Sequence, residues 1–326
     1  MKESLFHPVR IGKITIPGNL FLAPLAGFTD KAFRSICISN GASFTYSEMV
    51  SAEALARKSE KTQLLMERAL NEIFLGIQIF LPDADTAKRA LPEILKANPT
   101  VIDINCGCPV PKVVKNNAGA ALMHFPEKIE EIVKTIVSET DIPVTVKFRT
   151  GWDANSINYL EFAESAVKGG ASLLTMHART RSQGYSGEAS WDDLMILKSN
   201  FDIPIIGSGN IFTPEDAVRM LESTNIDGVL FARGAIGNPF IFNRTKSLIQ
   251  TGISNPAPEM DTKIKTAWKH LSLNIEYKGE KTACREMKKQ LCSYTKGEAG
   301  SAALRNRIVH AENLGDYREI FQEYLS

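Results

Sequence analysis

The segment 103–109, with the sequence DINCGCP, holds the residue types best suited to catalysis in this chain. It continues an apolar run and ends in a Gly/Pro turn, which predicts the C-terminal end of a buried strand. Parallel α/β folds place reactive groups at such ends. A lone Cys is more often a buried structural residue, but here the amide of Asn105 coincides with two thiols, Cys106 and Cys108. A zinc or redox pair is the alternative, yet no Cys/His set completes four zinc ligands, and we expect no metal.

Polar side chains also occur in the second halves of other apolar segments, where packing gives no reason for them. Gln78 lies in the third such segment, Lys147 and Arg149 in the fifth, and His177 and Arg179 in the sixth. An unpaired buried polar group costs about 1 to 3 kcal/mol. A ligand that pairs with these groups is therefore the simpler explanation.

Three turns have features suited to binding a phosphorylated planar ligand. The small residues of segment 23–27 (APLAG) let a flat ring lie close to the backbone. Segments 207–210 (GSGN) and 232–234 (ARG) end the last two apolar runs, where barrels bind phosphate. Lys147 suits the negative N1/O2 side of a reduced flavin. FMN fits better than a dinucleotide because no G-x-G-x-x-G turn opens a βαβ unit.

The elements that must position these groups are eight short apolar segments at intervals of about thirty residues. Most are followed by a helical pattern, so the chain predicts eight βα units and a TIM barrel. A doubly wound sheet is the alternative, but it usually has fewer repeats and reverses its strand order. The eight segments cover residues 19–27, 44–50, 74–81, 101–107, 143–149, 173–179, 204–210 and 228–234.

Helix signals fill the intervals, and the pattern changes after residue 242. Thr213 followed by Pro214 is a strong helix start. Segment 252–258 has the composition of a linker, and 261–325 shows helical spacing without strand signals. We expect an α/β barrel domain at 1–250 and a small all-helical domain at 251–326. The helix candidates are 31–40, 85–97, 126–138, 155–169, 191–200 and 213–223.

Charge is distributed unevenly along the chain. The whole sequence has a net charge of +1, but residues 261–310 hold eleven Lys and Arg against five Asp and Glu. A cation excess on one domain is expected for contact with a polyanion. A solvated helix surface is the alternative.

Composition and cysteine usage narrow the class of protein. The chain is 44% hydrophobic and 23% charged, which is ordinary for a soluble globular protein. Five sparse cysteines and a start without an apolar signal core indicate a reducing cytoplasm. No apolar run approaches the roughly 18 residues of a membrane span. We expect no membrane contact, no protein partner, and a monomer.

The motifs together resemble those of the tRNA-dihydrouridine synthase family across nearly the whole chain. The resemblance implies an FMN-dependent reduction of uridine in tRNA to 5,6-dihydrouridine, with NADPH, or NADH, as the electron donor. The matching segments are 22–27 with Asp30, 47–49, Gln78, 103–105 followed by 107–109, Lys147 with 149–152, and His177 with 179–181.

The resemblance also implies roles for individual residues. A hydride passes from flavin N5 to uracil C6, and Cys108 delivers a proton to C5, as a thiol that is protonated at neutral pH can do. Asn105 and Arg179 lie near the base. The expected cofactor residues are Pro24, Leu25, Ala26, Gln78, Lys147, His177, Ser208, Gly209, Asn210, Ala232 and Arg233, and the expected RNA contacts are Lys112, Arg285, Lys288 and Lys289.

Three features depart from the family pattern or stay open. Cys106 stands where many members carry Met, and we interpret it as a packing residue. The turns 208–210 and 231–234 have an unusual residue order, although Arg233 is retained. The loops 110–119 and 180–190 are candidate lids, with ordinary surface loops as the alternative.

Two other function classes fit part of the pattern. A flavin barrel that reduces a free pyrimidine, such as a dihydroorotate or dihydropyrimidine dehydrogenase, also uses Asn and Cys or Ser, but has no evident use for a basic helical domain. A non-catalytic RNA-binding module is the other alternative, and intact Asn105, Cys108 and Lys147 argue against it.

Overall fold

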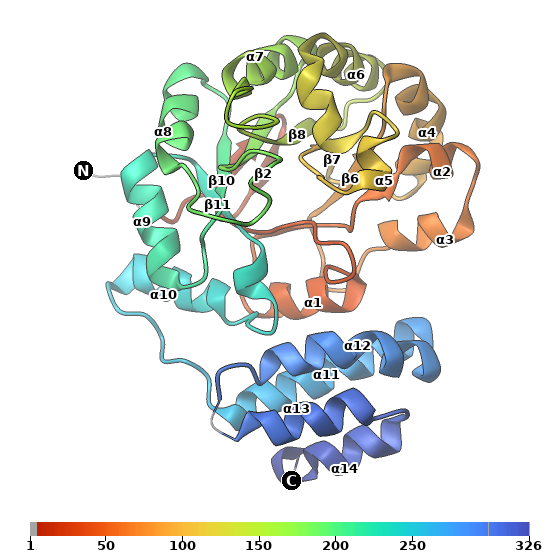
Figure 1. Cartoon of the computed structure of the whole chain (residues 1–326), viewed down its shortest axis with the longest axis vertical. Coiled ribbons are helices and arrows are strands. Elements are labelled where there is room, and N and C mark those ends of the chain that lie inside the picture. Colours follow the sequence, from red (N-terminus) through yellow and green to blue (C-terminus); the bar gives the residue numbers. More distant parts are fainter. Residues whose placement is uncertain (1–4, 299, 326) are drawn as a thin grey trace.

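The computed structural model describes residues 5–298 and 300–325 and contains a closed barrel of eight parallel strands. The barrel closes because β4 pairs with both β3 and β6, in parallel register. This confirms the predicted TIM barrel (Figure 1). Its strands are β3 (Leu20–Leu22), β4 (Phe44–Tyr46), β6 (Leu75–Phe80), β7 (Val101–Cys106), β8 (Val144–Arg149), β9 (Leu173–His177), β10 (Ile205–Ser208) and β11 (Gly228–Phe231).

Helices surround the barrel, and all six predicted helices are present. Thr213 caps the sixth, as its sequence indicated, and forms a reciprocal capping box with Asp216. A seventh helix, α10 (Ile241–Thr251), was not predicted and completes the eighth βα unit. The others are α1 (Lys31–Ser39), α4 (Ala84–Lys96), α6 (Pro126–Glu139), α7 (Tyr159–Gly169), α8 (Trp191–Asn200) and α9 (Pro214–Thr224).

Short elements occupy three of the connections at the C-terminal ends of the strands. After β4 the chain forms the short strand β5 (Val50–Ser51), α2 (Ala52–Ala56), α3 (Glu60–Gln63) and the 3₁₀ turn η1 (Leu64–Met66). After β7 it forms α5 (Pro111–Val114) and the 3₁₀ turn η2 (Gly119–His124). The last barrel strand is followed by η3 (Arg233–Ala235).

Apolar side chains fill both faces of the barrel strands. Inside, aromatic residues such as Phe21 and Phe44 pack together, with ring centroids 5.2 Å apart. A hairpin of β1 (Val9–Ile11) and β2 (Ile14–Ile16) packs onto this inner cluster. The hairpin was not predicted. Its strands are only three residues long, too short for a clear alternating pattern.

The remaining helices form a separate unit beside the barrel (Figure 1). They are α11 (Met260–Lys278), α12 (Glu280–Tyr294), α13 (Ser301–His310) and α14 (Leu314–Leu325). Ile264 and Leu271 lie in a hydrophobic cluster of their own, with Trp268 and Ile275 packed against it. The helical region is therefore confirmed. No helix among the described residues is long and apolar enough to cross a bilayer.

A polar contact joins the helical unit to α1. Lys278 of α11 donates to Asp30 Oδ2 at 2.7 Å, and the buried ring of His270 stacks on Phe33 with centroids 5.4 Å apart. Asp30 also caps α1 by accepting the N–H of Phe33. Burial raises the pKa of Asp30, but His270 and Lys278 outweigh it and hold that pKa well below its usual range.

We expect Lys278→Met to loosen the helical unit from the barrel. The depressed pKa means that the contact stabilises the folded state above about pH 3.9, the ordinary Asp value, and weakens as pH falls through the folded pKa. Loss of about 1 kcal/mol gives about fivefold faster proteolysis in the linker 252–259 at neutral pH. Lys281→Met, at an exposed position on α12, is the control. Equal cleavage rates in the two variants would contradict the prediction.

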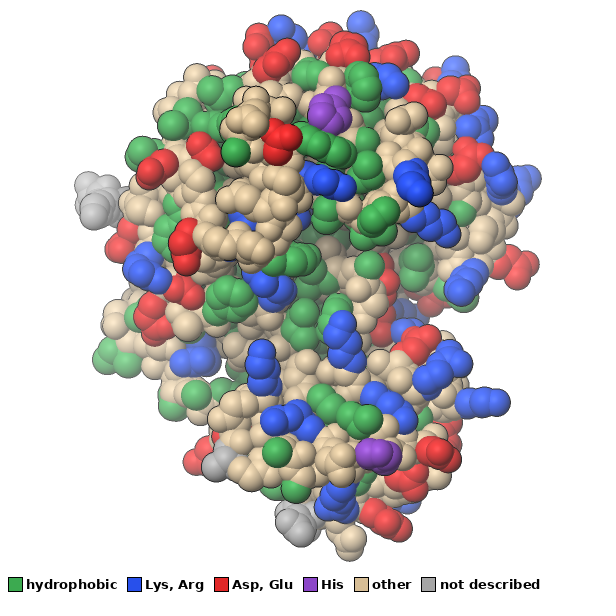
Figure 2. Space-filling model, in the orientation of Figure 1, with side chains coloured by type: hydrophobic (Ala, Val, Ile, Leu, Met, Phe, Trp, Pro, Cys, Tyr) green, Lys and Arg blue, Asp and Glu red, His purple; other side chains and the backbone are tan. Residues whose placement is uncertain are grey.

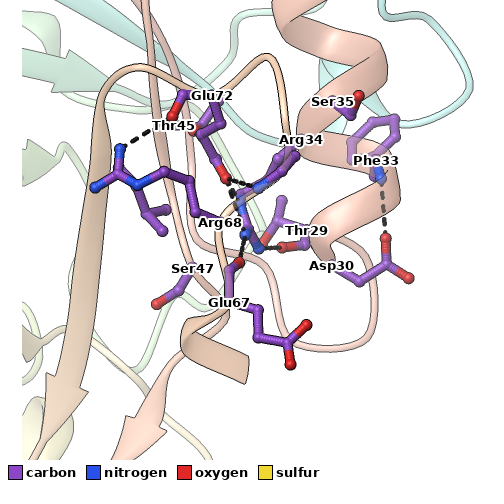
Figure 3. Close-up of polar contacts among 12 residues, drawn as sticks. Thr29, Asp30, Phe33, Arg34, Ser35, Thr45, Ser47, Glu67, Arg68 and Glu72 are labelled. Atoms are coloured by element: carbon purple, nitrogen blue, oxygen red, sulfur yellow. Dashed lines mark hydrogen bonds and ion pairs between the residues drawn. The ribbon is translucent and has the colours of Figure 1, made fainter. Parts of the chain in front are cut away.

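A buried ion pair ties the segment before β6 to α1 (Figure 3). Arg34 Nε donates to Glu72 Oε1 at 2.7 Å, and both side chains are almost fully buried. Glu72 also accepts from the Thr45 hydroxyl and the Ala69 N–H, while Arg34 donates to the carbonyl of Glu67. Every charge in the pair is therefore matched by further hydrogen bonds, as a buried ion pair requires.

Candidate active site

A cavity of about 500 Å³ lies at the C-terminal ends of the barrel strands, the end where barrels carry their active sites. One helical-unit side chain, Lys289, also lines it. The cavity brings together most of the predicted site residues, from seven separate strand ends and from the helical unit. These are Pro24, Leu25, Ala26, Gln78, Asn105, Cys108, Lys147, His177, Ser208, Gly209, Asn210, Ala232, Arg233 and Lys289.

A chain of side-chain hydrogen bonds holds the two amides in the cavity. Asn105 Nδ2 donates to Gln78 Oε1 at 2.7 Å, and Gln78 Nε2 donates to Asp103 Oδ2 at 2.6 Å. Asp103 also accepts from the Thr145 hydroxyl. The residues lie on neighbouring strands, since β7 pairs Gln78 with Asp103 and Asp103 with Thr145. The amides are thus oriented by partners within the barrel.

The two thiols lie in different environments. Cys106 is fully buried in the hydrophobic layer between strands and helices, which confirms that it is a packing residue. Cys108 lines the cavity, and its backbone N–H donates to Asn105 Oδ1 at 2.9 Å. Burial raises the pKa of the Cys108 thiol, and the nearby cations Arg149 and Lys147 offset part of the rise. The thiol is therefore protonated at neutral pH and can donate a proton.

The cavity wall is cationic. Its described lining holds Lys147, Arg149, Arg233 and Lys289 and no carboxylate. Burial and the neighbouring Arg149 lower the pKa of Lys147 to about 8. Lys147 has no hydrogen bond or ion pair among the described residues. Burial and the surrounding cations hold the pKa of His177 well below its usual range, so its ring is neutral. An anionic ligand would pair with these charges.

Backbone N–H groups and one cation occupy the β10 and β11 side of the cavity. Gly209 has φ of +129° and Asn210 has φ of +56°, and neither N–H is bonded to another described residue. The Arg233 guanidinium packs 4.3 Å from the Tyr185 ring centroid and 5.2 Å from that of Phe212, with no ion pair in the described chain. Free N–H groups beside a cation suit a phosphate.

Two arginines donate hydrogen bonds to backbone carbonyls around the cavity. Arg179 is only 2% exposed and does not line the cavity. Its guanidinium donates to the carbonyls of Ser186 and Gly187 and to the Asn210 side chain. Arg149 donates to the carbonyl of Gly107 at 2.7 Å and to loop 180–190. The structure therefore shows Arg179 anchoring loop 180–190, and the base contact that the family resemblance implies stays a prediction.

Several apolar lining residues escaped the sequence analysis. Phe28, Met49, Tyr185, Phe212 and Ile236 all contribute to the cavity surface. Phe28 and Phe212 each follow a glycine-containing turn that was singled out, so proximity to those turns was the available signal. Met49 belongs to segment 47–49, which matches the family, whereas Ile236 has an apolar side chain that carries no comparable signal.

Of the predicted RNA contacts, Lys289 lines the cavity. Figure 2 shows Lys and Arg side chains on the helical unit around the hollow. Lys289 Nζ lies 4.2 Å from the ring centroid of Phe28, so it bridges the helical unit and the barrel. Lys288 donates to the carbonyl of Val309, while Arg285 and Lys112 are exposed. A second groove of about 640 Å³ is lined by Lys288, Lys289, Cys292, Ser293, Lys296, Arg305 and Val309.

The fold and the site define a TIM-barrel oxidoreductase whose cavity carries a protonated thiol and cations without carboxylate partners among the described lining residues. No group of three or more potential metal-ligating side chains occurs in the described parts of the chain. Residues 21–325 match the family model described as dihydrouridine synthase, and the chain belongs to that family of flavin-dependent oxidoreductases.

Curated relatives cover nearly the full length. The chain is 44% identical to a probable tRNA-dihydrouridine synthase of Treponema pallidum, over 99% of this chain and 97% of the relative. It is 36% identical to tRNA-dihydrouridine synthase B of Pasteurella multocida, over 89% and 87%. A similar solved fold is the old yellow enzyme homologue of Zymomonas mobilis, with a TM-score of 0.52, 14% identity, and coverage of 77% and 94%.

Proposed function

We propose that this protein reduces specific uridines in tRNA to 5,6-dihydrouridine, with FMN as cofactor and NADPH, or NADH, as electron donor. One observation carries the proposal. The cavity places the protonated thiol of Cys108 beside the Asn105 amide, in a wall whose cations have no carboxylate partners among the described lining residues. The names of the relatives support the reaction and the substrate.

The described residues fit FMN at three points. The unpaired N–H groups of Gly209 and Asn210, with Arg233, would hold the phosphate. The buried cation of Lys147 would pair with negative charge on the ring system. Gln78, His177 and residues 24–26 would contact the ring from the other strand ends. When bound, reduced FMN supplies the hydride that adds to C6 of the uracil.

The residues of the chain supply binding and the proton. Asn105 Nδ2 has one N–H beyond the bond to Gln78 and would donate it to a uracil carbonyl. Cys108 donates its proton to C5, which completes addition across the C5=C6 bond and leaves a thiolate that a solvent proton restores. Arg149 and Arg179 hold loop 180–190, whose Tyr185 lines the cavity.

A uridine stacked in tRNA cannot enter a barrel mouth, so the nucleotide is extruded at a cost of a few kcal/mol. The helical domain 251–326 would supply the compensating contacts to phosphates, and the barrel domain 1–250 the chemistry. Arg285, Lys288, Lys289 and Lys112 would contact the RNA backbone. We propose a cytoplasmic monomer.

Reversing charge at two helical-domain lysines tests the RNA surface. The double variant Lys288→Glu and Lys289→Glu should weaken tRNA binding, and the slope of log affinity against log salt should fall by about two. Filter binding between low and moderate salt measures the slope. Lys134→Glu, on the outer helix α6 at an exposed position, is the control and should leave the slope unchanged. An unaltered slope in the double variant would remove these lysines from the interface.

Mapping dihydrouridine in tRNA from cells that lack this protein tests the proposed reaction. Loss of the modification at defined positions, restored by the intact gene, would confirm reaction and specificity together. Turnover of orotate or free uracil without any effect of tRNA would instead favour a dehydrogenase of free pyrimidines. Purified protein without bound flavin that still binds tRNA would favour an RNA-binding module.

A further inference from the structure

Asp103 lies below the cavity and does not touch it. It is 1% exposed, and neither of its oxygens belongs to the cavity lining. Oδ2 accepts from Gln78 at 2.6 Å, and Oδ1 accepts from the Thr145 hydroxyl at 2.5 Å. The proposed reaction gives this buried carboxyl no role, although it is bonded directly to one of the two amides in the cavity.

A carboxylate accepts hydrogen bonds and donates none, so it determines the direction of every bond above it. Gln78 must turn its nitrogen toward Asp103, and its oxygen then faces Asn105. Asn105 must turn its nitrogen toward Gln78, so its Oδ1 faces the backbone N–H groups of Gly107 and Cys108, at 3.1 and 2.9 Å. The Asp103 carboxylate thus orients the side chains of Gln78 and Asn105 and the turn that follows Asn105. It also orients the Thr145 hydroxyl.

We propose that Asp103 is a positioning residue that sets the polarity of this amide chain, so that Asn105 presents an N–H to the base and its Oδ1 holds the turn that carries Cys108. The consequence for the base rests on the proposed function. Both lone pairs of Asn105 Oδ1 are used by the turn. Asn105 can therefore bind a carbonyl of uracil, and it offers no acceptor to the 4-amino group of cytosine.

Thr145 permits a test in which two harmless changes combine into a harmful one. In Asp103→Asn the new amide keeps its oxygen toward Gln78, because its nitrogen can donate to the Thr145 hydroxyl. In Thr145→Val the carboxylate still accepts from Gln78. In the double variant the amide at 103 has no acceptor on the Thr145 side, so its orientation is no longer determined. The hydrogen bonds through Gln78 and Asn105 then have no fixed direction.

The first readout needs neither FMN nor RNA. Alkylation of Cys108 by iodoacetamide, followed by mass spectrometry of its peptide, reports how firmly Asn105 holds the turn. We expect wild-type rates in both single variants and about tenfold faster alkylation in the double variant, a coupling typical of residues in one hydrogen-bond network. FMN affinity, measured by flavin fluorescence, should fall in the double variant alone.

The wild type, the two single variants and the double variant form a double-mutant cycle. Additive effects on the alkylation rate in this cycle would overturn the proposal, as would a double variant with wild-type alkylation and FMN affinity. Thermal denaturation of all four proteins separates this role from a structural one, because a purely structural role lowers the melting temperature without coupling in the alkylation rate. If the wild-type protein forms no dihydrouridine, the proposed function fails, but the alkylation cycle still decides the role of Asp103.

Discussion

Cys108→Ala is expected to lower the rate of dihydrouridine formation by about 10²- to 10⁴-fold, the usual contribution of a positioned general acid. Cys108 is the one thiol among the described residues that line the cavity, and burial keeps it protonated at neutral pH. FMN binding and its reduction by NADPH should persist, because the contacts proposed for the cofactor lie on other strands. Single-turnover reduction of tRNA by the pre-reduced enzyme measures the loss directly.

Cys106→Ala is the matched control for that experiment. It lies two residues away and loses the same thiol, but its side chain packs between strands and helices. We expect some loss of stability, as for a small cavity in a core, and little change in the reduction rate at temperatures where the protein is folded. A larger rate loss in Cys106→Ala than in Cys108→Ala would show that Cys108 is not the proton donor.

Glu72→Ala is expected to destabilise the protein by about 3 to 5 kcal/mol, because it leaves the buried Arg34 guanidinium without its counter-charge. The pair is 1% and 0% exposed, and Glu72 receives two further hydrogen bonds, from Thr45 and Ala69. The segment that it holds leads directly into β6, which carries Gln78. Urea unfolding followed by tryptophan fluorescence measures the change in the free energy of unfolding.

An exposed ion pair provides the control for the Glu72 variant. Glu164 and Lys168 lie one helical turn apart on α7, with side chains 60% and 59% exposed. Glu164→Ala should leave the unfolding midpoint unchanged, because solvent screens such pairs. A Glu72→Ala midpoint equal to that of Glu164→Ala would show that the buried pair does not stabilise the fold.

Local patterns predicted the barrel, its eight strand ends and six outer helices, because strand and helix periods are short-range properties of the chain. They missed the β1–β2 hairpin, whose strands are too short, and α10, which follows the η3 turn after β11. The base contact of Arg179 came from the family resemblance and stays a prediction. The partners that turn Arg179 toward loop 180–190 include Asn210, 31 residues away, and no local pattern reports such a pairing.

The sequence by itself determined which chemical groups stand at the strand ends: an amide and thiols at 105–108, cations at 147 and 233, and glycines in the phosphate turns. Only the tertiary structure decided which thiol faces the cavity, which way the amides point, and that Lys289 reaches Phe28 on the barrel. The physical reason is the separation in sequence over which each property is determined. Residue type and period are set along the chain, whereas the direction of a side chain is set by hydrogen bonds and packing with residues far away in the sequence.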